Sequence, residues 1–206
     1  MTLITCPECG TEVSDLAMAC PRCGYPIRSP EQPKEIPPTP HSVAPSKFIV
    51  LSLVTLGLYP LYWAYRNWWW VKKTRDKEVI PVLRAIFSPI FMFSLLRHLE
   101  AEAADEEIDI IWSPLLIAVL FFALTMSWRL PDPYWLVSLL TFASLLAPQA
   151  TANAIYTKVS GQPPNANYSA FAIGVVIVGG IMLVLVLVGT FLPEVTEDVS
   201  PAITTL

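Results

Sequence analysis

The stretch AFAIGVVIVGGIMLVLVLVGTFL, residues 170–192, decides the class of fold, because it carries no charged residue over its whole length. A helix of about 20 apolar residues is long enough to cross the hydrocarbon layer of a bilayer, which is about 30 Å thick. Gly174, Gly179 and Gly180 within this stretch permit close contact with a neighbouring helix. We therefore predict a membrane span that ends at Pro193.

Three further uncharged runs precede this stretch, at residues 48–65, 110–128 and 133–157. The whole chain agrees with them, since 54% of its residues are apolar and only 15% are charged, which is unusual for a soluble protein. We predict a mainly α fold, an α-helical transmembrane bundle with three clear spans and two further short or re-entrant apolar segments. The spans are 110–128, 134 to about 154, and 170–192, and the shorter segments are 48–65 and 81–99.

The first apolar run, 48–65, ends in a belt of aromatic and basic residues. Arg66 and three tryptophans follow it, and then four more cations up to Lys77. Tryptophan favours the membrane interface, and lysine and arginine favour its cytosolic side, so a single crossing from a cytosolic start would place these cations outside. We therefore favour a re-entrant segment bent at Gly57 and Pro60, with a true span as the alternative.

The second short segment, 81–99, contains Pro89 and begins close to Arg84. After the proline, good helix formers carry an apolar stripe at Leu96, Leu99 and Ala103, which indicates a helix that leaves the membrane. A charged residue near such a segment is either a snorkelling anchor or a buried functional group. For Arg84 we favour the anchor.

All four cysteines lie in the first 23 residues, as CPECG at 6–10 and CPRCG at 20–24. Two such knuckles supply four thiolates for one tetrahedral zinc ion, so we predict structural Zn(2+) held by Cys6, Cys9, Cys20 and Cys23. Four protein ligands leave no open position for catalysis. A pair of disulfides or a redox-active pair are the alternatives. Thiolates persist in a reducing compartment, so we expect this end of the chain in the cytosol.

The two knuckles resemble the short zinc ribbons at the head of many prokaryotic membrane proteins. The stretch SKFIVLSLVTLGLYPLYWAYRNWWWVK, roughly residues 46–73, resembles a recurring membrane segment of bacterial proteins. Together they suggest a group of uncharacterised bacterial inner-membrane proteins with a CPxCG-type ribbon at the amino end. The resemblance implies zinc at the four cysteines and brings no activity with it.

The composition divides the chain into four parts. We predict a zinc ribbon at 1–28, a proline-rich linker at 29–46, a helical membrane domain at 47–193 and an acidic flexible tail at 194–206. The linker holds six prolines and little apolar content, which favours an extended spacer. A ligand for an SH3-like partner is the alternative for this segment.

The sequence argues against an enzyme and against a nucleic-acid-binding protein. The net charge is −4, and no metalloprotease, hydrolase or phosphate-binding motif is present. The acidic run 100–109 lacks the spacing of a calcium loop, and His41 and His98 have no second histidine at helical spacing. One polar cluster lies near a span end, and we expect it to hydrogen-bond a neighbouring helix. Its members are Gln149, Thr151 and Asn153.

Two classes of function remain. The first is a scaffold or regulatory interaction protein, multi-pass in the inner (plasma) membrane with its ribbon in the cytoplasm. It would bind the lipid bilayer, a protein partner through the ribbon, or a second copy through the helices. The alternative is a small-solute transporter or channel component, which the discontinuous segments 48–65 and 81–97 favour and the lack of buried acids opposes.

Overall fold

The computed structural model describes residues 3–14, 17–27 and 37–191. The chain forms two compact units, Met1–Pro37 and Pro38–Leu206. The boundaries predicted from the sequence at residues 28 and 46 stay predictions. The predicted acidic tail, 194–206, and the predicted stop at Pro193 lie outside the described residues.

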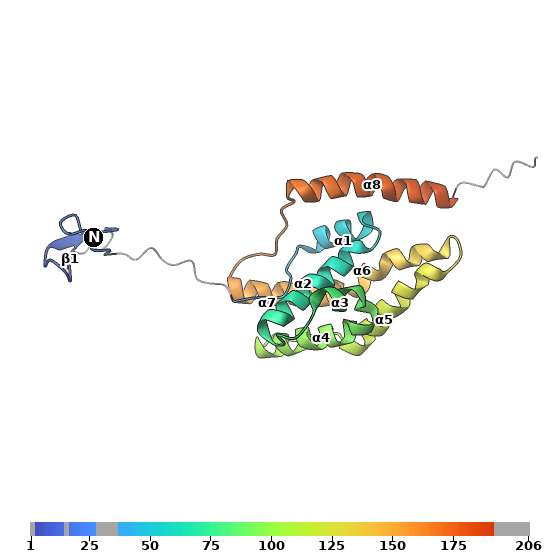
Figure 1. The fold of residues 1–206 in the computed structure, drawn as a ribbon, viewed down its shortest axis with the longest axis horizontal. Coiled ribbons are helices and arrows are strands. Elements are labelled where there is room, and N and C mark those ends of the chain that lie inside the picture. The colour runs from blue at the N-terminus through green and yellow to red at the C-terminus, as the bar shows by residue number, and fades with distance from the viewer. Residues whose placement is uncertain (1–2, 15–16, 28–36, 192–206) are drawn as a thin grey trace, which may run out of the picture. The chain divides into compact units, whose positions relative to one another are not determined.

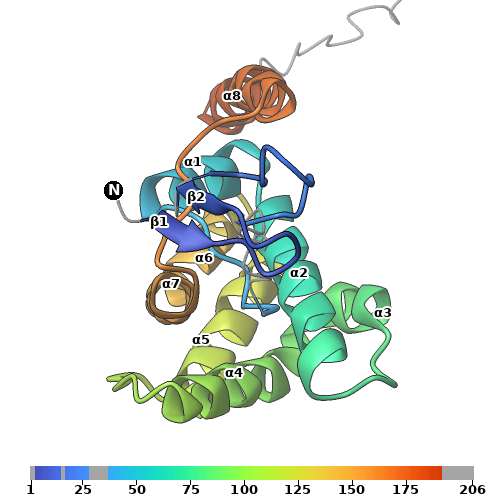
Figure 2. The ribbon, with the colours of Figure 1, turned by 90° about the vertical axis from the view of Figure 1, so that its left-hand side faces the viewer.

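The first unit is built on a two-stranded antiparallel sheet of β1 (Leu3–Thr5) and β2 (Glu12–Ser14) (Figure 2). Each cysteine knuckle closes in a tight turn that ends at a glycine. Gly10 and Gly24 have φ angles of +70° and +75°, a left-handed conformation that glycine adopts without steric cost. Their N–H groups donate to the carbonyl oxygen of the first cysteine of each knuckle, so the two turns have the same geometry.

The second unit is helical. Proline occupies the first position of α1, α3 and α5, where its missing N–H has no helical partner to lose. The elements are α1 (Pro45–Val54), α2 (Leu58–Thr74), α3 (Pro81–Ile86), α4 (Ser88–Asp105), α5 (Pro114–Met126), η1 (Ser127–Arg129), η2 (Tyr134–Leu140), α6 (Thr141–Ser144), α7 (Leu146–Ser160) and α8 (Ala170–Phe191).

The run 48–65 is broken between α1 and α2, which lie in opposite directions as a helical hairpin (Figure 1). Leu56 and Gly57 both have positive φ angles, of 51° and 89°. The predicted bend is therefore present at Gly57. Pro60 does not contribute to it, because this residue lies in the first turn of α2, where helix N–H groups have no intrahelical acceptor.

The prediction of three clear spans is wrong, because two helical stretches are long and apolar enough to cross a membrane in the described part of the chain. The predicted span 110–128 fails the length requirement. Ser113 is extended and Pro114 begins α5, whose 13 residues reach about 20 Å at 1.5 Å each. A turn with Trp128 and Arg129 follows, and α5 packs against η2 across it.

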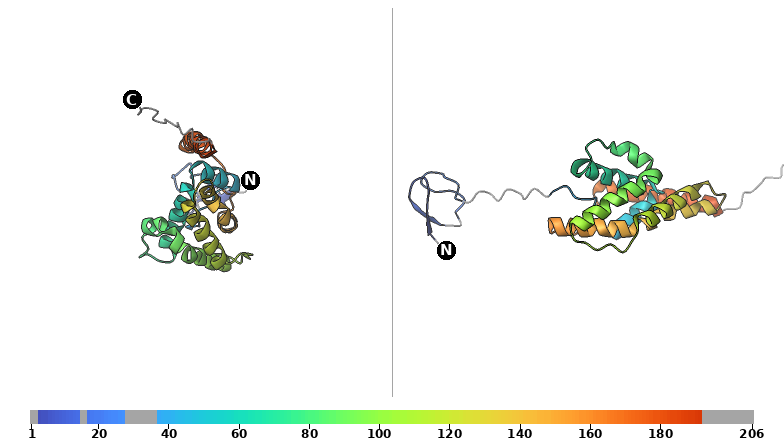
Figure 3. Two further views of the ribbon diagram at one scale, coloured as in Figure 1. Left: turned by 90° about the vertical axis from the view of Figure 1, so that its right-hand side faces the viewer. Right: turned by 90° about the horizontal axis from the view of Figure 1, so that it is seen from below.

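The two candidate spans differ in their surroundings. The stretch Tyr134–Ser160 comprises η2, α6 and α7. Its most apolar 18 residues have a mean hydropathy of 1.3, and half of them are buried within the protein. In contrast, the most apolar 18 residues of Ala170–Phe191 have a mean hydropathy of 3.1, and none of them is buried. Figures 1 and 3 show α8 on one side of the unit, with α4 and α5 on the other. The length and composition of α8 are those of a helix that can cross a membrane, and its exposed apolar surface agrees with this.

The core of the second unit lies among α1, α2, α4, α5 and α6. Trp63 and Trp68 of α2 are its largest fully buried side chains, and they pack with Phe48 of α1 and Leu145 beside α7. The predicted apolar stripe of α4 is buried along its length, at Leu96, Leu99 and Ala103.

Candidate functional site

The four cysteines of the first unit converge on one point. Their sulfur atoms all lie within 4.8 Å of one another, and none forms a disulfide. The Sγ atoms of Cys6 and Cys23 are 3.7 Å apart, and those of Cys9 and Cys20 are 3.6 Å apart. Within the described residues, no other group of three or more histidine, cysteine or acidic side chains lies close enough to hold a metal ion.

These distances fit a zinc ion. A tetrahedron with Zn–S bonds of about 2.3 Å has edges of about 3.8 Å between sulfurs. A disulfide would instead need two sulfurs at about 2.05 Å. The residues present therefore match a closed site with four cysteine ligands, and a structural Zn(2+) ion bound there would be held by thiolates alone.

Little apolar surface supports the metal centre. Val13, Cys6 and Cys20 are buried, and Ile27 packs against them, whereas Met18 and Tyr25 are exposed. Because so few side chains are buried, the free energy of metal binding has to supply most of the stability of the ribbon.

One of the four ligands has polar contacts with Thr11: the Cys9 thiol donates a hydrogen bond to the Thr11 hydroxyl oxygen at 3.3 Å. Contacts with the side chain and the backbone of Thr11 lower the pKa of Cys9 to about 6. The thiolate is the form that binds a metal, so this shift favours binding at Cys9, whereas burial and hydrogen bonds with the other three cysteines raise the pKa of Cys23 to about 12.

A comparison with protein families agrees with this geometry. Residues 5–27 match the model of the zinc-ribbon domain. No curated protein and no solved structure matches the chain. The amino-terminal unit is thus a zinc ribbon with structural Zn(2+).

In the second unit, Gln149 and Asn153 of α7 bind the backbone of the segment just before α1. The Oδ1 atom of Asn153 accepts hydrogen bonds from the Val43 N–H and the Ser42 hydroxyl, both at 3.0 Å, and its Nδ2 donates to the Val43 carbonyl at 2.9 Å. Gln149 Nε2 donates to Asn153 Oδ1 at 2.8 Å, and Gln149 Oε1 accepts from the indole of Trp63.

Asn67 of α2 binds the same segment. Its Oδ1 accepts from the His41 N–H at 3.0 Å, and its Nδ2 donates to the Trp63 carbonyl at 2.9 Å. We call Asn67, Gln149 and Asn153 with residues 41–43 the polar clasp. Its three amide side chains belong to residues that are at most 8% exposed, so their hydrogen bonds are shielded from water.

The sequence located two members of the polar clasp and predicted part of their role. The expected hydrogen bond to a neighbouring helix is present between Gln149 and Trp63 of α2, but Gln149 and Asn153 also bind an extended segment more than 100 residues earlier in the chain. Thr151, the third member of the predicted cluster, accepts a hydrogen bond from the Trp112 indole at 2.9 Å. A polar pair one helical turn apart in an apolar span was the available signal.

His41 lies in the clasp segment with its ring against that of Tyr62, at a centroid distance of 5.7 Å. Its Nε2 atom is buried and has no hydrogen-bond partner among the described residues. Burial lowers the pKa of His41 to about 4, and the positive charges of Arg66 and Lys47 act in the same direction. The imidazole is therefore neutral near pH 7.

Arg84 is a partly exposed cation on an aromatic surface. Its guanidinium lies 4.5 Å from the centroid of the Trp68 ring and 5.6 Å from that of Phe91, and 3.9 Å from the Asp76 carboxylate. The side chain is 29% exposed. These contacts are those of a side chain that stacks at the edge of the core.

The acidic run 100–109 is partly engaged in ion pairs. Arg75, at the end of α2, contacts the carboxylates of Glu102 at 2.7 Å and Asp105 at 2.5 Å. Arg97 contacts Glu100 at 2.8 Å. The carboxylates near the end of α4 thus connect it to the end of α2.

Lys47 is the charged residue that sequence reasoning missed. It is 9% exposed, and it is the one lysine or arginine among the buried side chains of the described residues. Its ammonium group donates to the Asn167 carbonyl at 2.5 Å and lies 5.4 Å from the centroid of the Tyr168 ring. The available signal was a lone cation in the first turn of an otherwise uncharged helix.

Proposed function

We propose that this chain is a scaffold or regulatory interaction protein, anchored in the inner (plasma) membrane with its zinc ribbon on the cytoplasmic side. The polar clasp is the observation that carries the proposal. In a transporter, the buried polar groups of the helices are expected to face an aqueous path. Here Asn67, Gln149 and Asn153 instead hold the segment that connects the ribbon with α1.

The orientation follows from redox chemistry and charge. The four sulfurs form no disulfide and are arranged to bind zinc as thiolates, which persist in a reducing compartment. The α1–α2 hairpin returns the chain toward the side on which α1 begins, and its last turn carries Lys72 and Lys73. Cations on that side of the membrane fit the positive-inside bias. These features support a cytoplasmic ribbon and a re-entrant α1–α2 segment.

The ribbon carries apolar side chains that a protein partner could cover. Leu3 and Met18 are 69% and 68% exposed, and Ile4 and Tyr25 are also exposed. A closed site with four cysteine ligands offers no open metal position for chemistry, so contact with a partner is the role that suits this unit.

The test is co-purification from native membranes in mild detergent. Changing Leu3 and Met18 together to serine leaves the four cysteines intact, so the metal content should not change. We expect a specific partner to be lost from this variant. Ile111→Ser is the matched control, because Ile111 is a fully exposed apolar residue of the other unit.

The same variants separate the alternative function. Reconstituted in liposomes, a transporter or channel should give solute flux that the ribbon substitutions leave unchanged. Such flux, together with an unchanged set of co-purifying proteins, would overturn the proposal.

A further inference from the structure

A cavity of about 410 Å³ lies among α1, α2 and the beginning of α8, and its lining changes from polar to apolar. The polar side chains that line it come from the clasp segment, α1, α2 and the loop before α8. They include His41, Lys47, Tyr62, Asn165 and Ser169. The apolar lining includes Leu51, Leu58, Phe171 and Val175.

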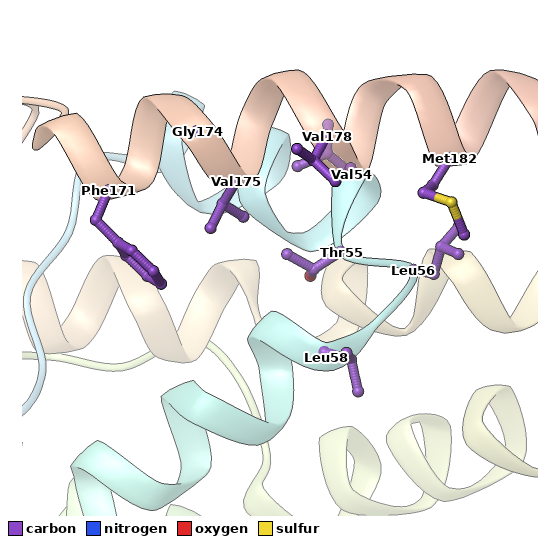
Figure 4. Close-up of a pocket in the computed structure, with 10 residues that line it drawn as sticks. Val54, Thr55, Leu56, Leu58, Phe171, Gly174, Val175, Val178 and Met182 are labelled. Atoms are coloured by element: carbon purple, nitrogen blue, oxygen red, sulfur yellow. The ribbon is translucent and has the colours of Figure 1, made fainter.

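This cavity continues into a second one. A groove of about 550 Å³ between α8 and the α1–α2 turn shares Thr55, Leu58, Phe171 and Val175 with it. Figure 4 shows Phe171 and Val175 of α8 directed toward α1 and α2. Both volumes are within the range of about 300–1,000 Å³ that is typical of small-molecule sites.

Close helix contact at Gly179 bounds the groove. A Cβ atom at this position would overlap the carbonyl oxygen of Val54, so α8 approaches the end of α1 as closely as only glycine allows. Away from this contact, Val178 and Met182 line the groove. The apolar part of the site is therefore a groove beside the point where α8 crosses α1.

The polar end contains a buried cation without a counter-ion. Among the described residues, no carboxylate lies within ion-pair distance of Lys47. A buried charge is costly unless an opposite charge accompanies it. The buried Nε2 atom of His41, which has no hydrogen-bond partner among the described residues, belongs to the same lining. Both observations indicate an anionic, hydrogen-bonding group at this end.

We propose that this groove binds one anionic phospholipid of the surrounding bilayer, with its phosphate at Lys47 and one acyl chain along α8. The polar part of the cavity, at Lys47, would hold the phosphate, and the adjoining apolar groove would hold the acyl chain. The outer surface of α8 is exposed and apolar, so a lipid can enter sideways from the bilayer.

The head-group test uses native mass spectrometry of the full-length protein in mild detergent. The probes are phosphatidylglycerol and phosphatidylcholine with identical acyl chains. Both lipids carry a phosphate, but the choline ammonium neutralises the charge of phosphatidylcholine, whereas phosphatidylglycerol is a net anion that can compensate Lys47. We therefore expect the protein to retain phosphatidylglycerol with about tenfold preference, the effect of about one charge-assisted contact in a buried site. Lys47→Gln should abolish the preference and Lys47→Arg should keep it. Lys77→Gln, which removes an exposed lysine, is the matched control.

The acyl-chain test uses Val178→Trp, which fills the groove and should weaken retention of both lipids. Glycerol phosphate alone, added in excess, should not displace the bound lipid. Equal preference in Lys47→Gln and Lys77→Gln would overturn the proposal. So would unchanged retention in Val178→Trp, or displacement by glycerol phosphate, which would indicate a site for small soluble anions.

Discussion

The zinc ribbon and the helical unit are stabilised in different ways. In the ribbon, four sulfurs within 4.8 Å of one another take the place of a core, and few other side chains are buried. In the helical unit, large apolar side chains pack around a polar clasp whose three amide residues, Asn67, Gln149 and Asn153, are buried. We therefore expect each unit to unfold under a different perturbation, while the other unit stays folded.

Metal removal should have the largest effect. Structural zinc contributes about 10–16 kcal/mol to the folding of comparable small modules, so a strong chelator should unfold the ribbon. Hydrogen exchange of the full-length protein should show lost protection within residues 3–27 and unchanged protection in α2, α4 and α7. Loss of protection in both units would contradict their independence.

Gln149→Ala should have the next largest effect, and in the other unit. The substitution leaves the Trp63 indole N–H without its acceptor and opens a cavity, which should lower the free energy of unfolding by about 4 kcal/mol. Unfolding in detergent would measure this change. Zinc content should be unaffected. Gln162→Ala, at an exposed glutamine, is the matched control and should change neither quantity.

Acid should weaken the helical unit through His41. Its pKa is about 4 in the folded protein and 6.5 ordinarily, so below pH 6.5 the unfolded chain binds a proton that the folded chain does not. Stability is therefore fully present above pH 6.5 and falls between pH 6.5 and 4, by on the order of 3 kcal/mol. His41→Phe, which keeps an aromatic ring beside Tyr62, should flatten this part of the profile. An unchanged slope would contradict the assignment.

The contact of α8 with α1 gives the smallest expected effect. Gly179→Ala places a methyl group against the Val54 carbonyl and should cost about 2 kcal/mol, or separate the two helices. Gly180→Ala meets no atom within 4 Å and should be neutral. A spin-label distance between α1 and α8 measures the separation. An equal stability and an equal spin-label distance in the two variants would show that α8 does not contact α1 at Gly179.

The features that local chemistry determines were predictable from the sequence. The cysteine spacing in CPECG and CPRCG fixes how each knuckle presents its sulfurs, and an uncharged run such as 170–191 has one stable form in lipid. The bend at Gly57 was likewise predictable, because glycine supplies positive φ angles without steric cost.

The features that depend on distant partners were not predictable. Nothing near Asn153 in the sequence indicates that it binds Val43, 110 residues earlier. The predicted span 110–128 was wrong because a lack of charge does not reveal that Pro114 begins the helix. Lys47 was overlooked because its burial depends on the loop before α8, and loop positions do not follow from local sequence.

The zinc content of protein extracted from membranes without reductant tests the account most directly. We expect about one zinc ion and four free thiols for each chain, and loss of the metal when Cys6 and Cys23 are both changed to serine. The helical unit should stay folded in that double variant. A metal-free protein with oxidised sulfurs, or full zinc retention in the double variant, would contradict the account, in which zinc bound by four thiolates folds the ribbon and the helical unit anchors it in the membrane.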